Sequence, residues 1–104
     1  MTDLSIIKCI PCNGNTPTLS EVEITELLKE VPEWSRNKNT IEKTFVFTNF
    51  KEALIFFNRV ANIAEEEDHH PDMGIQNWKK VVLSFTTHAA KGLTRNDFIM
   101  ASKV

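Results

Sequence analysis

Residues 49–64, Asn-Phe-Lys-Glu-Ala-Leu-Ile-Phe-Phe-Asn-Arg-Val-Ala-Asn-Ile-Ala, carry the clearest periodic signal in the sequence. Asn49 is a residue type that favours helix N-caps, and the apolar residues after it recur every three or four positions. The residues that share this face are Phe50, Ala53, Leu54, Phe57, Val60, Ala61 and Ala64. The spacing predicts a core helix of about four turns. Phe56 and Ile63 widen the apolar stripe, which suggests further burial against a partner subunit.

The chain before this helix predicts a first helix and a β-hairpin. Ser20 and Glu23 have the spacing of a capping box, the apolar residues at 24, 27, 28 and 31 follow at helical intervals, and Pro32 ends the run. Residues 34–36 and 44–47 then read as two strands around the polar turn at 37–39.

The chain after the central helix predicts two more strands and a last helix. Pro71 favours an extended backbone at the preceding residue, so residues 70–75 are expected to form a short strand. Residues 78–87 alternate as a long strand, with Val81, Leu83 and Phe85 on one face. Thr94 then begins a helix with Asp97 at its third position.

The predicted order of elements is α-β-β-α-β-β-α. No strand-helix-strand spacing requires a parallel sheet, so the expected fold is α+β: a four-stranded antiparallel sheet with three helices on one face. We expect residues 18–104 to form this single domain and residues 1–17 to be an N-terminal extension.

Composition excludes several classes of function. The chain has 104 residues, of which 41% are hydrophobic and 25% charged, as in ordinary globular domains. A formal net charge of -2 and the lack of a basic block argue against nucleic-acid binding. No apolar run is long enough to span a bilayer, and Asp3 stands where a secretory signal would be basic. A cytoplasmic protein without a membrane partner is therefore expected.

Two cysteines, Cys9 and Cys12, lie in the extension. A redox Cys-x-x-Cys motif closes a strand and opens a helix, whereas here a turn-rich stretch follows. A zinc ribbon needs a second pair of ligands, and the sequence contains no further cysteine. Two reduced thiols are the favoured interpretation, with a metal or redox protein kept as a weak alternative.

All three histidines, His69, His70 and His88, fall within one window of 20 residues. Histidine can both give and take protons near neutral pH. Four acids, residues 65–68, precede the pair at the negative end of the helix dipole, where some neighbouring group must offset them. At least one of these four acids is a candidate to orient an imidazole, and Asp97 is another candidate, although it also has the spacing of a helix cap.

A metal site is the rival chemistry, because three histidines and nearby carboxylates supply enough ligands for zinc. Adjacent residues of an extended chain point to opposite sides, so His69 and His70 do not readily share one ion. The spacing therefore favours acid–base chemistry, with no metal and no cofactor.

The sequence resembles the pterin-4a-carbinolamine dehydratase family over roughly residues 9 to 101. The segments that carry the resemblance are Glu65-Glu66-Glu67-Asp68-His69-His70-Pro71, Trp78, Thr86-Thr87-His88 and Gly92-Leu93-Thr94-Arg95-Asn96-Asp97 with Ala101. Trp34, the helix at 50–64 and the Cys9-Ile-Pro-Cys12 leader also resemble family members. Met73 departs from the family, in which an aromatic residue often stands here, so that the fit of the substrate is in question.

The resemblance implies a function for this constellation. His69, His70 and His88 would line a pterin pocket, with Glu65 and Asp97 in support. The reaction would be dehydration of 4a-hydroxytetrahydropterin to quinonoid dihydropterin, which recycles the pterin after an aromatic amino acid hydroxylase. We expect His69 and His88 to transfer the protons and His70 to bind the pterin.

The resemblance also implies an assembly and an alternative. Family members are homodimers or homotetramers, and an animal member serves as the dimerisation cofactor of a transcription factor. The alternative function is accordingly a binding module that acts as an assembly or transcriptional partner. Retention of all three histidines favours the enzyme.

Overall fold

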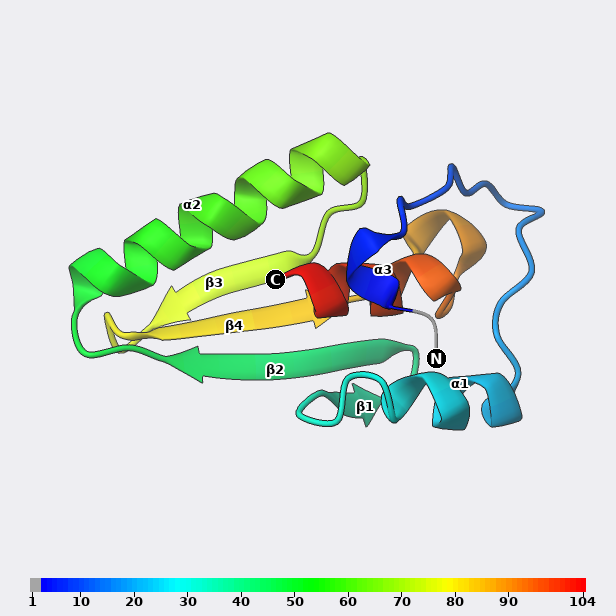
Figure 1. Ribbon diagram of the computed structural model, residues 1–104, viewed down its shortest axis with the longest axis horizontal. Helices are drawn as coiled ribbons and strands as arrows, with labels where there is room; N and C mark the ends of the chain where they lie inside the picture. Colours follow the sequence, from blue (N-terminus) through cyan, green and yellow to red (C-terminus); the bar gives the residue numbers. More distant parts are fainter. Residues whose placement is uncertain (1–2) are drawn as a thin grey trace.

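The computed structural model describes residues 3–104, and the α+β fold expected from the sequence is confirmed (Figure 1). The main elements follow the predicted order α-β-β-α-β-β-α, with two short 3₁₀ helices, η1 and η2, in addition. In chain order they are η1 (Leu4–Ile6), α1 (Glu21–Leu28), β1 (Ser35–Asn37), β2 (Thr40–Val46), α2 (Phe50–Glu67), β3 (Asp72–Gln76), β4 (Lys80–Phe85), η2 (His88–Ala90) and α3 (Arg95–Lys103).

The predicted helix starts are confirmed. The Ser20 hydroxyl accepts the Glu23 N–H at 3.2 Å, and the Glu23 carboxylate accepts the Ser20 N–H at 2.9 Å, which completes the capping box of α1. Asn49 Oδ1 accepts the Glu52 N–H at 2.9 Å and so caps α2.

The antiparallel sheet has the strand order β1-β2-β4-β3. Ile41 of β2 lies opposite Phe85 of β4, and Phe45 lies opposite Val81. Ile41 and the alternate β4 side chains Val81, Leu83 and Phe85 are completely buried. This face receives the helices, because α2 contacts β3 and β4 and α3 contacts β4. The core therefore lies between one face of the sheet and the helices.

The opposite face of the sheet is left open. Its side chains, such as Thr44, Val46, Val82 and Ser84, are exposed or half-buried. Val46 keeps 64% of its surface.

The strand boundaries differ from those expected. Trp78 was predicted to begin the long strand, but Asn77 and Trp78 have left-handed backbones (φ 48° and 53°) and form the β3–β4 turn. β4 ends at Phe85 rather than at residue 87, because the chain turns into η2. Alternation of apolar residues shows which face of a strand is buried, but it does not locate the ends of the strand. The ends depend on the conformation of the adjoining turn.

The N-terminal segment shares the core with the rest of the chain. Leu4 and Cys9 are buried, and η1 packs against α3. The division of the chain between residues 17 and 18 stays a prediction. Among the described helices, none combines the length and the apolar character needed to cross a membrane.

Candidate active site

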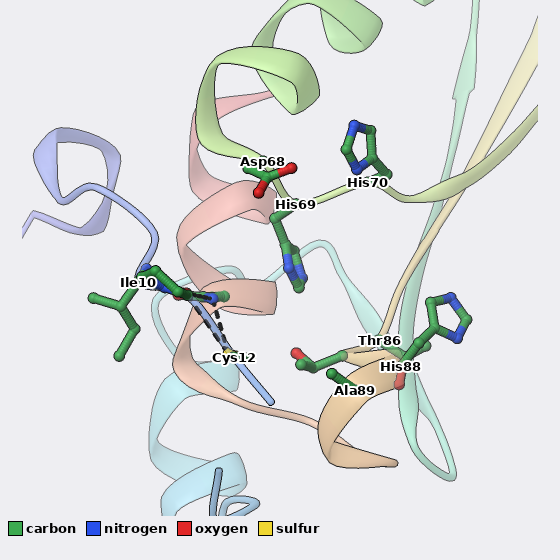
Figure 2. A pocket seen from close by; sticks show the side chains of 11 residues that line it. Ile10, Cys12, Asp68, His69, His70, Thr86, His88 and Ala89 are labelled. Atoms are coloured by element: carbon green, nitrogen blue, oxygen red, sulfur yellow. Dashed lines mark hydrogen bonds between the residues drawn. The ribbon is translucent and has the colours of Figure 1, made fainter. Parts of the chain in front are cut away.

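A hollow of about 260 Å³ lies where α2 ends and η2 begins (Figure 2). Four parts of the chain line it: residues 10–12, residues 68–70, residues 86–89 and Asn96. All three histidines singled out from the sequence, His69, His70 and His88, are among the lining residues. Glu65 and Asp97 are not among them, and Asp97 lies behind His69, fully buried.

His69 reaches the hollow because α2 ends in a left-handed residue. Asp68 has φ 52°, and the N–H groups of both Asp68 and His69 donate to the Ala64 carbonyl. Such a reversal satisfies the free carbonyls at a helix end and turns the next side chain back toward the core. The His69 ring is consequently buried and stacks on Phe85, with 6.3 Å between ring centroids and 9° between planes.

Asp97 holds the His69 ring from behind. His69 Nε2 lies 2.6 Å from Asp97 Oδ1. Asp97 Oδ2 accepts the Thr87 hydroxyl at 2.9 Å and the Thr94 N–H at 3.0 Å. An ionised carboxylate can only accept hydrogen bonds, so we assign the hydrogen of the shared contact to His69 Nε2, which leaves Nδ1 as the proton acceptor. Asp97 thus both caps α3 and orients an imidazole.

His70 and Glu65 form a second, exposed pair. His70 Nε2 lies 3.3 Å from Glu65 Oε2, and the two side chains keep 54% and 78% of their surface. Exposed pairs of this kind contribute little to positioning or stability. Figure 2 shows the rings of His69 and His70 pointing in different directions, as expected for adjacent residues in an extended chain.

His88 begins η2, directly after the strand expected at residues 78–87. In Figure 2, His88 lies on one side of the hollow and Ile10 and Cys12 lie on the other, with His69 between them. The loop that carries His88 is closed by backbone hydrogen bonds between Thr87 and Gly92. A Cβ at Gly92 would come 2.8 Å from Thr18 Cγ2, so any larger residue would force the Thr18 side chain to shift.

Sequence reasoning missed two groups of site residues. Thr87 and Thr94 complete the ring of donors around Asp97, and their hydroxyls lie 2.8 Å apart. Ile10, Pro11 and Cys12 form a wall of the hollow although they belong to the predicted extension. The sequence signals for Thr87 and Thr94 were the adjacent His88 and the spacing to Asp97. No local pattern, in contrast, places an N-terminal segment beside a distant loop.

Two of the four acids at the end of α2 have side-chain partners: Glu65 lies against His70, and Glu67 contacts the N-terminal segment. Glu67 accepts the Cys9 N–H at 2.8 Å, and this hydrogen bond holds the pKa of the Glu67 carboxyl below its ordinary value. Lys8 Nζ donates to the Glu66 carbonyl at 3.2 Å, which places a cation at the negative end of the helix. The N-terminal segment therefore helps to offset the negative charge of residues 65–68 at the C-terminal end of α2.

Cys9 is not a reactive thiol. Burial raises the pKa of the Cys9 thiol to about 12, and the Glu67 carboxylate adds to the rise. The thiolate is the nucleophile and metal ligand, so a thiol that stays protonated at neutral pH is inert. This environment argues against redox chemistry at Cys9.

The placement of the possible ligand side chains also matters for whether the site could hold a metal ion. Within residues 3–104 no group of three or more His, Cys, Asp or Glu side chains is arranged to hold an ion. What the site offers is a buried imidazole–carboxylate pair beside two exposed imidazoles, an arrangement suited to moving protons.

Comparisons with known proteins identify relatives of this chain. The protein-family model described as pterin 4 alpha carbinolamine dehydratase matches residues 17–104. A Nitrosospira multiformis protein named "Putative pterin-4-alpha-carbinolamine dehydratase" is 43% identical over 102 residues, covering 98% of this chain and 89% of its own. A Chlorobium luteolum protein of the same name is 42% identical over 107 residues, covering 99% and 93%.

A solved structure has the same fold. The crystal structure of a transcriptional coactivator/pterin dehydratase from Brucella melitensis matches with a TM-score of 0.78 and 31% identity. The match covers 84% of this chain and 94% of the other.

We predict that Asp97→Ala destabilises the fold by about 3–5 kcal/mol, since it removes the acceptor of three buried donors. Asp72→Ala, an exposed position in β3, is the matched control and should change the free energy of unfolding by less than about 0.5 kcal/mol. Urea denaturation measures both. A loss below about 1 kcal/mol for Asp97→Ala would contradict the role given to this carboxylate.

Proposed function

This chain belongs to the pterin-4a-carbinolamine dehydratase family, a family of hydro-lyases, and we propose that it dehydrates 4a-hydroxytetrahydropterin by histidine acid–base catalysis. The observation that carries the proposal is the buried His69–Asp97 pair on a hollow lined by two further histidines. The step is proposed to occur in the cytoplasm and to recycle the pterin after an aromatic amino acid hydroxylase has used it.

The reaction requires two proton transfers. The bond from ring carbon 4a to its hydroxyl breaks, the hydroxyl takes up a proton and leaves as water, and a ring nitrogen loses a proton as the quinonoid double bond forms. No electron is gained or lost overall, so the residues need only give and take protons. General acid–base catalysis of this kind contributes roughly 10² to 10⁴-fold.

His69 is the proposed proton acceptor. Asp97 holds Nε2–H, so Nδ1 has the free lone pair, and the carboxylate stabilises the imidazolium once the proton has moved. This is the arrangement of base and orienting acid found in catalytic triads. Asp97 therefore acts through His69, while the buried Thr87 and Thr94 keep the carboxylate in place.

His88 is the proposed proton donor to the leaving hydroxyl, and His70 the ligand that binds the pterin. The exposure of His88 suits exchange of its proton with water between turnovers. Glu65 supports His70 only weakly, because both side chains are exposed. The remaining alternative, a binding module without activity, predicts no acceleration at all.

We expect the full chain to accelerate formation of quinonoid dihydropterin over the spontaneous rate in a running pterin-dependent hydroxylase assay. His69→Ala and His88→Ala should each lower kcat by about 10²-fold or more. The double variant should be little worse than the more damaged single variant, as for groups that act together.

Two further variants sharpen this test. His70→Ala should raise KM more than it lowers kcat, and Glu65→Gln should change either constant by less than about fivefold. Full activity in both His69→Ala and His88→Ala would show that the proton transfers are assigned to the wrong residues. Wild-type rates equal to buffer, with the protein folded, would favour the binding module.

We predict that turnover survives exhaustive chelation, because imidazoles can handle both protons at neutral pH without a Lewis acid. A Cys9→Ser, Cys12→Ser double variant removes both thiols as adventitious zinc ligands. Activity lost on chelation and restored by zinc in that variant would show that the histidines hold a metal.

We also propose that the protein is a symmetric homodimer or homotetramer. Phe50, Leu54 and Ile55 of α2 keep 50%, 39% and 61% of their surface, and soluble proteins seldom leave such apolar stripes uncovered. Light scattering at micromolar concentration should give a dimeric or tetrameric mass. Leu54→Glu should lower that mass, whereas Val22→Glu on the exposed side of α1 should not; a monomeric wild type would refute the proposal.

A further inference from the structure

Residues 8–12, here called the N-terminal strap, are held against the hollow by two side chains, the first of which is Asn96. Asn96 is 3% exposed. Its Oδ1 accepts the Ile10 N–H at 3.0 Å, and its Nδ2 donates to the Ile10 carbonyl at 2.6 Å. Nδ2 also lies 3.2 Å from Cys12 Sγ. The amide therefore pairs with both backbone groups of Ile10, as a neighbouring strand would.

A second anchor holds the other end of the strap. Glu67 accepts the Cys9 N–H at 2.8 Å, and its side chain is only 11% exposed. Lys8 adds a contact of 3.5 Å to the same carboxylate. The strap is thus fixed at residues 9 and 10, immediately before the residues that line the hollow.

Both anchors are next to the proposed acid–base pair in sequence. Glu67 stands two residues before His69, and Asn96 stands directly before Asp97. The end of α2 and the first turn of α3 therefore position both the imidazole–carboxylate pair and the strap. A shift of the strap relative to His69 would require one of these two helix ends to move.

The chemistry of the strap surface is suited to an apolar ring face. The N–H and carbonyl of Ile10 are both occupied by Asn96, and Pro11 has no N–H to offer. Pro11 and Cys12 supply the strap's surface in the hollow, whereas the Ile10 side chain is 66% exposed and points away from His69 and His88 in Figure 2. Flat bicyclic ligands are held by such apolar walls, with polar groups elsewhere fixing their orientation.

We propose that the N-terminal strap is a substrate-binding wall of the pterin pocket and that Asn96 is the positioning residue that sets its place. The inference rests on the proposed function, since the ligand is that of the dehydratase. The wall contacts the substrate equally before and during the reaction, so it contributes uniform binding and governs KM rather than kcat.

Steady-state kinetics on the full chain test the wall. Asn96→Ala, Glu67→Gln and Pro11→Ser should each raise KM, by about tenfold for Asn96→Ala, with kcat changed by less than about twofold. Asn39→Ala and Glu66→Gln change exposed side chains of the same types and should leave both constants unaltered. Pro11 is exposed, so Pro11→Ser removes no buried group and remains informative if Asn96→Ala folds poorly.

Thiol labelling tests the same inference without turnover. With iodoacetamide, a saturating stable 7,8-dihydropterin should slow labelling of Cys12, which lines the hollow, at least fivefold. Cys9, buried and protonated, should label slowly in the wild type and faster in Asn96→Ala, because the strap is released. Mass spectrometry of the peptides separates the two cysteines.

The outcomes distinguish this inference from the proposed function. An active wild type whose strap variants keep the original KM, with Cys12 labelling unaffected by the pterin, overturns the wall alone. If the wild type is inactive but the pterin still protects Cys12 from labelling, the substrate-binding wall is supported and the proposed dehydratase activity is refuted. If there is neither turnover nor protection of Cys12, both the proposed activity and the substrate-binding wall are refuted.

Discussion

Asp97 is a carboxylate without exposed surface, and a buried charge is tolerated only when its oxygens are fully satisfied. The donors that satisfy it come from three places: His69 after α2, Thr87 after β4 and Thr94 before α3. If any of these segments moved away, a charge or a donor would be left unpaired in the core. The end of the central helix, the end of the central strand and the start of the last helix are therefore joined at one side chain.

The same contacts at Asp97 position the groups of the proposed chemistry. A helix cap at the third position of α3 fixes Asp97 locally, so that its other oxygen is available for the imidazole. The ring of His69 is held on two sides, by the carboxylate and by the stacked Phe85. A ring held in this way loses little conformational freedom when substrate binds. A base is most effective when its position is already fixed before the reaction.

The proposed assembly surface and the proposed active site lie at opposite ends of α2. The helix has 18 residues and hence a length of about 27 Å. Its apolar, exposed residues gather toward Phe50, whereas His69 follows its C-terminus, as Figure 1 shows for the two ends of α2. Association through the start of α2 would leave the hollow accessible, and the open face of the sheet lies on the other side from the helices.

Local rules in the sequence determined the elements and their caps. The capping box of Ser20 and Glu23, the cap at Asn49 and the alternation of Val81, Leu83 and Phe85 act over two to four residues, so a single sequence reveals them. The three histidines were candidates because of their residue type and their closeness in sequence. The ends of β4 and the turn at Trp78 were misplaced, because backbone conformation in a turn depends on how the two strands pair.

Only the tertiary structure decided how these histidines differ. His69 is buried on Asp97, 28 positions away, while His70 beside it is exposed. Asn96 pairs with Ile10 across 86 positions and brings the strap to the hollow. Contacts over such separations arise from the packing of helices on the sheet, and neither periodicity nor spacing encodes them; the sequence by itself determined which groups were present, and the packing decided which of them meet.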